Sequence, residues 1–515
     1  MIYATRNRWR PSSSLVAALL GMTVVVHGAG AQKLASPDWQ AFDKYVAQAA
    51  KDWHVPALAI AVVKDDSLVF AKGYGVLENG KDARANEHSR FAIGSTTKAM
   101  TSAALAMLVD EGKVKWDAHV TDYIPELELY DPWVTRELTV RDLLTHRTGL
   151  PGIDQFWVRW HYTTADMIRR LRYVKPETSL RTTWDYNNVM YSLAGVIIER
   201  ASGMSWENFI RQRIFTPLGM NESETLVSEI KGKSNVAIPH VLLGDSVRAV
   251  PMRSTDAIAS AGSVWSSVSD MSKWMRFILD SGRVGGKQLI APATFREIVA
   301  PQIRAPMEEY PALQLAKPTF FSYGLGWFVQ DYRDHPVLMH TGSIDGECAI
   351  IGLMPSEHIG VYVLENLDHA ELRHGLMYTV FDLFNANENA APARDWSKDL
   401  HELFDAPRAN MAGRGGRVAQ QAAVKPSLSL EKYAGTYVDS TYGTVNVTFA
   451  NGALTAQVVT DPARELEPIN YETFRTKTSE DATNLTFVPD GNGGVAGVRI
   501  SGITFARQRS ANRRG

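Results

Sequence analysis

The sequence predicts an α+β domain followed by a small antiparallel β domain. Its 515 residues are too many for one ordinary hydrophobic core, so two folded domains are expected. Up to about residue 385, long helical patterns alternate with short apolar runs rich in β-branched residues. From residue 427 to 512 only short strand-like runs occur. Residues 386–426 lie between these parts, and their Ala, Arg, Gly and Gln content predicts a linker.

Residues 1–31 have the pattern of a secretory signal. Three arginines lie within the first ten residues, residues 15–26 are apolar, and residues 29–31 form an A-x-A cleavage site. The apolar run is too short to span a membrane comfortably, and an uncleaved N-terminal anchor is the alternative. We therefore expect an exported protein, periplasmic or secreted, without a stable membrane span after cleavage.

The composition is that of an ordinary globular protein. Hydrophobic residues make up 45% and charged residues 21% of the chain, and the net charge is −2, so nothing indicates nucleic acid as a partner. Cys348 is the only cysteine, which excludes an intramolecular disulfide. It is predicted to pack as a small apolar residue.

Hydrophobic periodicity predicts the elements of the first domain in order. Helical spacing predicts helices at 38–55, from Ser95 to Gly112, and at 140–144, 191–201, within 257–282 and at 372–385. Apolar β-rich runs predict a hairpin from 57–63 and 68–74, then strands at 324–329, 348–353 and 359–364. In the second domain, runs at 436–438, 444–449, 454–459, 485–487 and 498–503 predict a small antiparallel barrel or sandwich.

The helix that begins at Ser95 carries a candidate nucleophile. Lys98 lies one turn later on the same face, and the backbone N–H groups of a helix N-terminus point at any oxyanion formed there. A lysine flanked by apolar residues loses its proton more easily than in water and can then act as a base. The same S-x-x-K pattern occurs at 228–231 and 429–432, but only Ser95 opens a long apolar helix.

Two further motifs follow in order. Tyr186-Asn187-Asn188 is the only Y-x-N in the chain and precedes a helix. Tyr186 could exchange a proton with Ser95 or a leaving group if the Lys98 ammonium lowers its pKa, and the Asn188 amide could hold the substrate and Lys98. A buried tyrosine with a satisfied hydroxyl is the alternative interpretation of Tyr186.

The third motif is His340-Thr341-Gly342-Ser343, at the end of one apolar run and before another. On an edge strand, the Ser343 N–H would join that of Ser95 in an oxyanion hole. Gly342 has no side chain, so a substrate can approach the strand closely. A core histidine is the alternative interpretation of His340.

These three motifs resemble those of the serine β-lactamase and penicillin-binding-protein superfamily, on the side of class C β-lactamases, D,D-peptidases and esterases. The resemblance covers about residues 38–385 and includes further matching turns at 143–151, 215–220, 260–267 and 323–327. It implies an antiparallel sheet flanked by helices, with an all-helical subdomain, over residues 32–385. Residues 433–437 and 442–445 resemble the lipocalin-like β domain appended to some members.

The resemblance also implies roles. Ser95 would form an acyl-enzyme, Lys98 would activate it, and Tyr186 would relay the proton. Asn188 and residues 340–343 would bind a small-molecule or peptide substrate, and neither a metal nor a cofactor would be needed. His340 stands where class C β-lactamases have lysine, which favours a D,D-peptidase, D-aminopeptidase or esterase.

Two alternatives remain: a β-lactamase, and a catalytically weak protein that binds peptidoglycan or β-lactams. Loss of Ser95, Lys98 or Tyr186 would have favoured the binding protein, but all three are present. The sequence does not predict the oligomeric state.

Overall fold

The computed structural model describes residues 37–244, 246–385, 394–412, 425–477 and 482–508. The signal sequence predicted for residues 1–31 lies outside these ranges. Within them, no helix combines the length and hydrophobicity needed to cross a membrane.

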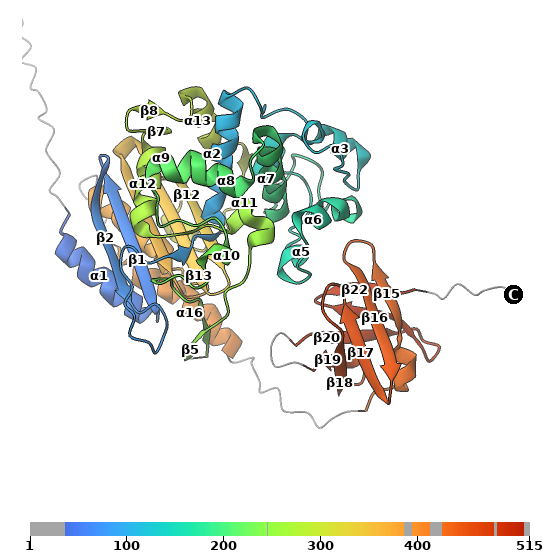
Figure 1. Ribbon diagram of the computed structural model, residues 1–515. Helices are drawn as coiled ribbons and strands as arrows, with labels where there is room; N and C mark the ends of the chain where they lie inside the picture. The colour runs from blue at the N-terminus through green and yellow to red at the C-terminus, as the bar shows by residue number, and fades with distance from the viewer. Residues whose placement is uncertain (1–36, 245, 386–393, 413–424, 478–481, 509–515) are drawn as a thin grey trace, which may run out of the picture. The chain divides into compact units, whose positions relative to one another are not determined.

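The first domain is built on an eight-stranded antiparallel sheet (Figure 1). The strand order is β2-β1-β14-β13-β12-β11-β10-β9. The strands are β1 (Ala57–Lys64), β2 (Ser67–Gly75), β9 (Ile303–Arg304), β10 (Phe321–Tyr323), β11 (Phe328–Tyr332), β12 (His335–Ile344), β13 (Glu347–Met354) and β14 (Ile359–Glu365). The predicted α+β class with an antiparallel sheet is thereby confirmed.

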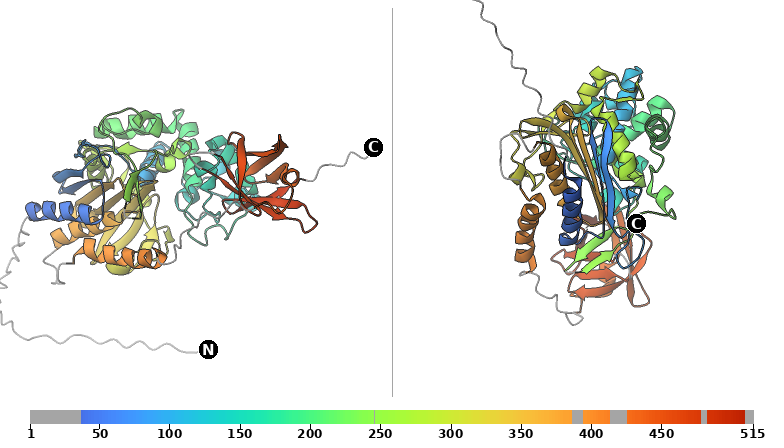
Figure 2. Two further views of the ribbon diagram at one scale, coloured as in Figure 1. Left: turned by 90° about the horizontal axis from the view of Figure 1, so that it is seen from below. Right: turned by 90° about the vertical axis from the view of Figure 1, so that its left-hand side faces the viewer.

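Helices cover both faces of this sheet, which explains the continuous apolar runs of its central strands. Successive side chains of a strand point to opposite faces. In β1, Leu58, Ile60 and Val62 pack with helices α1 (Trp39–Asp52) and α15 (Leu372–Asn385). The intervening Ala57, Ala59, Ala61 and Val63 share a core with α2 (Thr97–Asp110) and α12 (Val268–Leu279). Figure 2 shows the two helical layers on either side of the strands.

The first domain contains further helices, most of which are labelled in Figure 1. They are α3 (Pro132–Glu137), α4 (Val140–Leu144), α5 (Gln155–Val158), α6 (Thr164–Arg170), α7 (Asn188–Ser202), α8 (Trp206–Ile210), α9 (Thr216–Leu218), α10 (Val227–Ile230), α11 (Ala259–Gly262), α13 (Pro292–Val299) and α14 (Leu313–Ala316). The limits of α7 follow from its sequence: the Asn187 side chain accepts from the Met190 N–H, and Gly203 ends the helix at φ 76°. This N-cap puts Asn188 in the first turn of the helix.

Eight strands close into an antiparallel barrel in the C-terminal part of the chain. They are β15 (Gly435–Asp439), β16 (Gly443–Ala450), β17 (Ala453–Val458), β18 (Arg464–Asn470), β19 (Thr473–Thr476), β20 (Asn484–Pro489), β21 (Val495–Ile500) and β22 (Ile503–Arg507). Alternate residues such as Val445 and Val447 are buried while Asn446 is exposed, which gives the barrel its core. Of the two predicted β architectures, the barrel is confirmed.

The predicted linker, residues 386–426, contains a helix that the prediction missed. Helix α16 runs from Trp396 to Ala412. The Trp396 ring stacks on Tyr378 at 4.6 Å between ring centroids, and Leu400 is fully buried. These two side chains pack the start of α16 against α15. They were not recognised in the sequence because the segment as a whole is rich in Gly and Arg.

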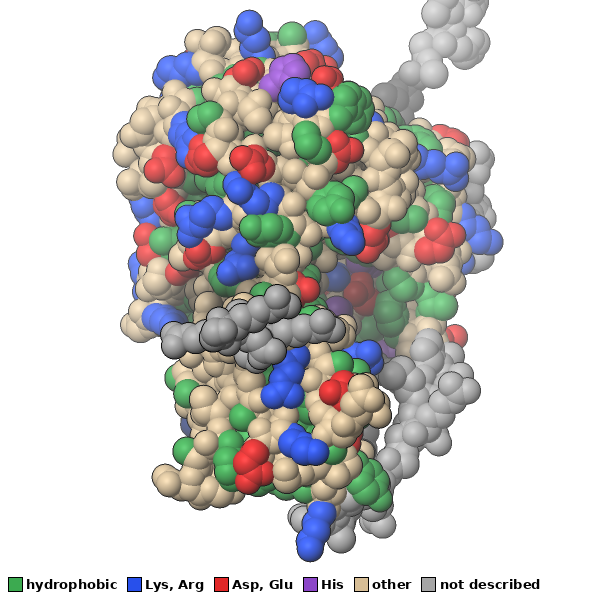
Figure 3. All heavy atoms as spheres, turned by 90° about the vertical axis from the view of Figure 1, so that its right-hand side faces the viewer, with side chains coloured by type: hydrophobic (Ala, Val, Ile, Leu, Met, Phe, Trp, Pro, Cys, Tyr) green, Lys and Arg blue, Asp and Glu red, His purple; other side chains and the backbone are tan. Residues whose placement is uncertain are grey.

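The surface carries no strong bias of charge on the face drawn in Figure 3, where Lys and Arg side chains alternate with Asp and Glu. This agrees with the near-neutral net charge of the chain. Cys348 is buried in β13, and burial raises the pKa of its thiol to about 11, so it behaves as an apolar residue.

Candidate active site

Ser95 lies where a short strand turns into the central helix. Strand β3 (Phe91–Ala92) is followed by a 3-10 turn, Gly94–Thr96, that runs directly into α2. Ser95 is partly exposed, whereas every other residue from 91 to 108 is buried. Ser95 is thus accessible from the surface at the start of a helix, as the sequence predicts.

Lys98 is fully buried beneath Ser95. Its Nζ lies 3.0 Å from Ser95 Oγ, 2.7 Å from Asn188 Oδ1 and 2.8 Å from the carbonyl oxygen of Ala261 in α11. Burial lowers the pKa of Lys98 from its usual 10.5 to about 7, and the charge of Asp154 opposes this effect. A substantial share of the lysine is therefore a neutral amine at neutral pH.

The three contacts of Lys98 fix the direction of its lone pair. The oxygens of Asn188 and Ala261 are acceptors only, so the neutral amine donates its two hydrogens to them. Its lone pair then points at the third neighbour, the Ser95 hydroxyl. This arrangement suits a general base for Ser95.

Asn188 itself is oriented by Asp154, a residue that the sequence analysis did not single out. The Asn188 Nδ2 donates to Asp154 Oδ1 at 3.0 Å, which leaves Oδ1 of the amide for Lys98. The Trp157 indole also donates to Asp154 at 2.8 Å. Asp154 directly precedes α5, and no local sequence pattern distinguishes it from other acidic residues.

Tyr186 lies beside this pair. Lys98 Nζ is 4.8 Å from the centre of its ring, and its hydroxyl shares a hydrogen bond with Ser95. Burial raises the pKa of Tyr186 well above its usual value, and the bond to Ser95 only partly opposes this. The condition under which Tyr186 would accept a proton, a pKa lowered by Lys98, is therefore not met, because burial raises this pKa instead. Tyr186 is a neutral phenol with a proton to donate.

The third motif lies on β12, where the strand has one free edge. Pairing of β12 with β11 stops at Met339, opposite Phe328, whereas pairing with β13 continues to Ile344. A Cβ on Gly342 would lie 2.0 Å from the Ile93 carbonyl oxygen, and one on Gly94 would lie 2.8 Å from the Ser343 nitrogen. Both glycines are thus needed for β12 to pack against the turn before Ser95, and this contact brings the Ser343 backbone beside the nucleophile.

The side chains of the third motif have different environments. Ser343 is exposed, and the Thr341 hydroxyl is 2.9 Å from that of Tyr310. His340 is buried, with Nε2 2.8 Å from the Tyr323 hydroxyl and Nδ1 2.7 Å from the Thr341 carbonyl oxygen. Burial lowers the pKa of His340 to about 3, so it is neutral at pH 7. The structure therefore brings all the predicted site residues together, and it places His340 behind the site surface with both ring nitrogens engaged.

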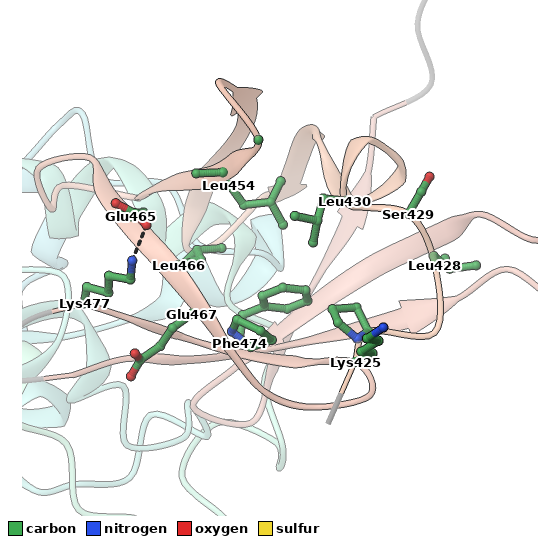
Figure 4. A pocket seen from close by; sticks show the side chains of 14 residues that line it. Lys425, Leu428, Ser429, Leu430, Leu454, Glu465, Leu466, Glu467, Phe474 and Lys477 are labelled. Atoms are coloured by element: carbon green, nitrogen blue, oxygen red, sulfur yellow. Dashed lines mark hydrogen bonds and ion pairs between the residues drawn. The ribbon is translucent and has the colours of Figure 1, made fainter. Parts of the chain in front are cut away.

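A separate pocket of about 430 Å³ lies in the C-terminal barrel (Figure 4). Apolar side chains, among them Leu454, Leu466 and Phe474, form its floor, and a Lys477–Glu465 ion pair lies at one side. All of its lining residues fall between 425 and 477, so it shares none with the Ser95 site.

The link between Asp154 and Lys98 gives a testable pH dependence. We expect kcat/KM for a neutral ester to rise with pH through about 7, as the Lys98 ammonium loses its proton. Asp154→Asn removes the charge that favours the ammonium, so the midpoint is expected to move to lower pH. Trp157→Phe is the matched control, since it removes one hydrogen bond to Asp154 but keeps the charge. An unchanged or higher midpoint in Asp154→Asn would contradict the assignment.

Comparisons with known proteins agree with this geometry. Residues 42–381 match the family described as Beta-lactamase, and residues 419–512 match a domain of unknown function, DUF3471. An unguisins hydrolase of Aspergillus campestris is 28% identical over 421 residues, covering 78% of this chain and 76% of that protein. Penicillin-binding protein 4 of Amycolatopsis lactamdurans is 27% identical over 324 residues, covering 61% of this chain and 81% of that protein.

A solved structure shares the fold. The octameric penicillin-binding protein homologue from Pyrococcus abyssi is 21% identical with a TM-score of 0.62, covering 91% of this chain and all of that one. Because the family match spans most of the chain, and the S-x-x-K, Y-x-N and H-T-G segments meet at one site, the chain belongs to the β-lactamase and penicillin-binding-protein-like superfamily of serine hydrolases.

Proposed function

We propose that this protein cleaves an ester, amide or peptide bond through an acyl-enzyme on Ser95. The observation that carries the proposal is the hydrogen-bonding pattern of Lys98. The neutral amine donates its two hydrogens to the oxygens of Asn188 and Ala261. Its lone pair is then directed at the Ser95 hydroxyl, whose Oγ lies 3.0 Å from Lys98 Nζ. A buried lysine with a pKa near 7 is a base suited to neutral pH.

In the proposed reaction, Ser95 Oγ attacks the substrate carbonyl carbon while its proton passes to Lys98. The negative charge that develops on the carbonyl oxygen is stabilised by the backbone N–H groups of Ser95 and Ser343. The new ammonium of Lys98 lies over the Tyr186 ring at 4.8 Å, a favourable position for a cation. Tyr186 donates its phenolic proton to the leaving group and recovers one from Lys98, and water then releases the acyl group.

The environment of His340 favours substrates other than β-lactams. A permanent cation at this position would attract the carboxylate of a β-lactam, but His340 is neutral and buried. We therefore favour a D,D-peptidase, D-aminopeptidase or esterase activity. A β-lactamase is the second candidate, because the matched family bears that name and one relative is a penicillin-binding protein. We further propose that the enzyme acts outside the cytoplasm, which the signal-like pattern of residues 1–31 supports.

An intact-mass time course with a penicillin tests the proposal, with ester and D-amino-acid amide panels run on the same preparation. We expect turnover of an ester or amide substrate by the wild type. A lasting penicillin adduct would indicate a penicillin-binding D,D-peptidase with slow deacylation, and rapid drug consumption without an adduct would indicate a β-lactamase. Neither acylation nor turnover of any substrate would leave the non-catalytic binding protein as the better interpretation.

A further inference from the structure

Arg373 is a buried cation at the start of α15, behind the third motif. Its side chain is 3% exposed. Nη1 donates to the carbonyl oxygen of Gly342 at 2.6 Å, to Ser343 Oγ at 2.9 Å and to the carbonyl oxygen of Ala349 at 3.3 Å. Nη2 donates to Glu371 at 3.1 Å. None of the predicted site roles uses Arg373.

Arg373 reaches β12 from the face of the sheet opposite to Ser95. Along β12, Val337 and Met339 pack on the same side as α15, whereas Leu338 belongs to the core that contains α2. By the alternation of a strand, the Ser343 side chain points to the α15 side, where Arg373 contacts it. The missing Cβ of Gly342 would point at Ile93, on the Ser95 side. Arg373 therefore contacts β12 from the face of the sheet that points away from Ser95.

The contact between Arg373 and the Gly342 carbonyl indicates the direction in which the next backbone N–H, that of Ser343, points. The carbonyl of Gly342 and the N–H of Ser343 belong to one planar trans peptide, so they point in opposite directions. The carbonyl of Gly342 accepts from Arg373, whose Nη1 also donates to the carbonyl oxygen of Ala349, the residue of β13 that is paired with Gly342; this carbonyl therefore lies on the side of β13. The N–H of Ser343 then points to the free edge of β12, which begins beyond Met339 and lies beside Gly94.

We propose that Arg373 is a positioning residue that holds and polarises the Gly342–Ser343 peptide, and so strengthens the Ser343 N–H as a donor to the oxyanion. A hydrogen bond from a cation to a peptide carbonyl draws electron density from the amide and makes its N–H a better donor. The inference rests on the proposed acyl-enzyme mechanism.

The surroundings keep Arg373 charged. Burial alone would lower the pKa of the guanidinium, but the Glu371 carboxylate next to it raises that pKa instead. Glu365 and Cys348 also face it, and burial raises the pKa of both groups, which disfavours their charged forms. A buried cation paired with a single carboxylate is costly to keep. Here it supplies three donated bonds to β12 and β13 at the point where the strand meets the nucleophile.

The experiment compares matched ester and thionoester substrates in the wild type and in Arg373→Gln. Sulfur accepts hydrogen bonds weakly, so a thionoester gains less from an oxyanion hole than an ester does. We expect Arg373→Gln to lower kcat for the ester by about 10- to 100-fold, less than loss of a direct donor, with little change in KM. The thionoester rate is expected to fall much less, and Arg373→Lys to restore part of the ester rate.

Glu371→Gln is the matched control, because it disturbs the same buried cluster but removes no donor to Gly342. Its ester-to-thionoester ratio is expected to stay near that of the wild type. An equal loss for both substrates in Arg373→Gln would show general misfolding of the site and overturn the inference, as would no loss at all.

A second measurement needs no substrate. The Ser343 amide proton signal in the NMR spectrum should move upfield in Arg373→Gln, because the amide loses polarisation. If the wild type turned over neither substrate, the proposed function would fail, and an unshifted Ser343 signal would still refute the role of Arg373 independently.

Discussion

Ser95→Ala is expected to lower kcat by about 10⁴- to 10⁶-fold, as removal of a serine nucleophile does in other acyl-enzyme hydrolases. The neighbouring groups cannot substitute for it. Lys98 is fully buried and Thr96 is 1% exposed, so neither reaches a substrate carbonyl. The fold should be unaffected, because the Ser95 hydroxyl lies at the surface of an otherwise buried segment. Single-turnover kinetics with an activated ester, together with intact mass, would measure both acylation and turnover.

The chain offers a matched control for this substitution. Ser228 also begins an S-x-x-K pattern, but it is exposed on the short helix α10. Ser228→Ala should therefore acylate at the wild-type rate. Equal loss in both variants, or acylation of Ser95→Ala at the wild-type rate, would exclude Ser95 as the nucleophile.

Lys98→Met is expected to lower the acylation rate by about 10³-fold or more, since it removes the base but leaves the nucleophile and oxyanion donors in place. The apolar side chain of methionine fits a fully buried position without a desolvation cost. Loss of activity should therefore occur without loss of folding. The acylation rate as a function of pH is the measurement: the rise through about 7 that is expected for the wild type should be absent.

Lys98→Arg separates two roles of the lysine. Arginine keeps a positive charge near Ser95 but does not deprotonate in proteins, so it cannot accept the serine proton. If Lys98 acts as a base, Lys98→Arg should be as slow as Lys98→Met. Substantial activity in Lys98→Arg would instead show that Lys98 acts through its charge, and Tyr186 would then become the candidate base.

Most of the fold could be predicted from the sequence because its signals are local. The hairpin at β1 and β2 and the helix ending at Gly203 come from short patterns of hydrophobicity and turn residues. The strands that were missed lack those patterns. β18 has the sequence Arg-Glu-Leu-Glu-Pro-Ile-Asn, whose charges and proline are unusual in a strand. It is a strand because it pairs with β17 and β19 in the closed barrel, and this long-range pairing outweighs its weak local preference.

The candidate site was predictable where residues follow one another along the chain. Ser95 and Lys98 are one helical turn apart, and residues 340–343 are consecutive. Asp154 and Arg373 were not predicted because they act across long separations. Asp154 is hydrogen-bonded to Asn188, which is 34 residues away in the sequence, and Arg373 is hydrogen-bonded to Gly342, which is 31 residues away. The pKa of Tyr186 could not be predicted from the sequence either, since desolvation depends on the whole surrounding fold.

The closure of the C-terminal barrel limits how other proteins can bind it. Each of its eight strands pairs with two neighbours, so in the described residues no strand has a whole edge without a partner. A peptide that docks by adding a strand would therefore have to open an existing ladder. The ladder between β17 and β18 and that between β15 and β22 are the short ones, with two residue pairs each. Partners that leave the ladders intact are expected at the loops, at the outward side chains or at the pocket of Figure 4.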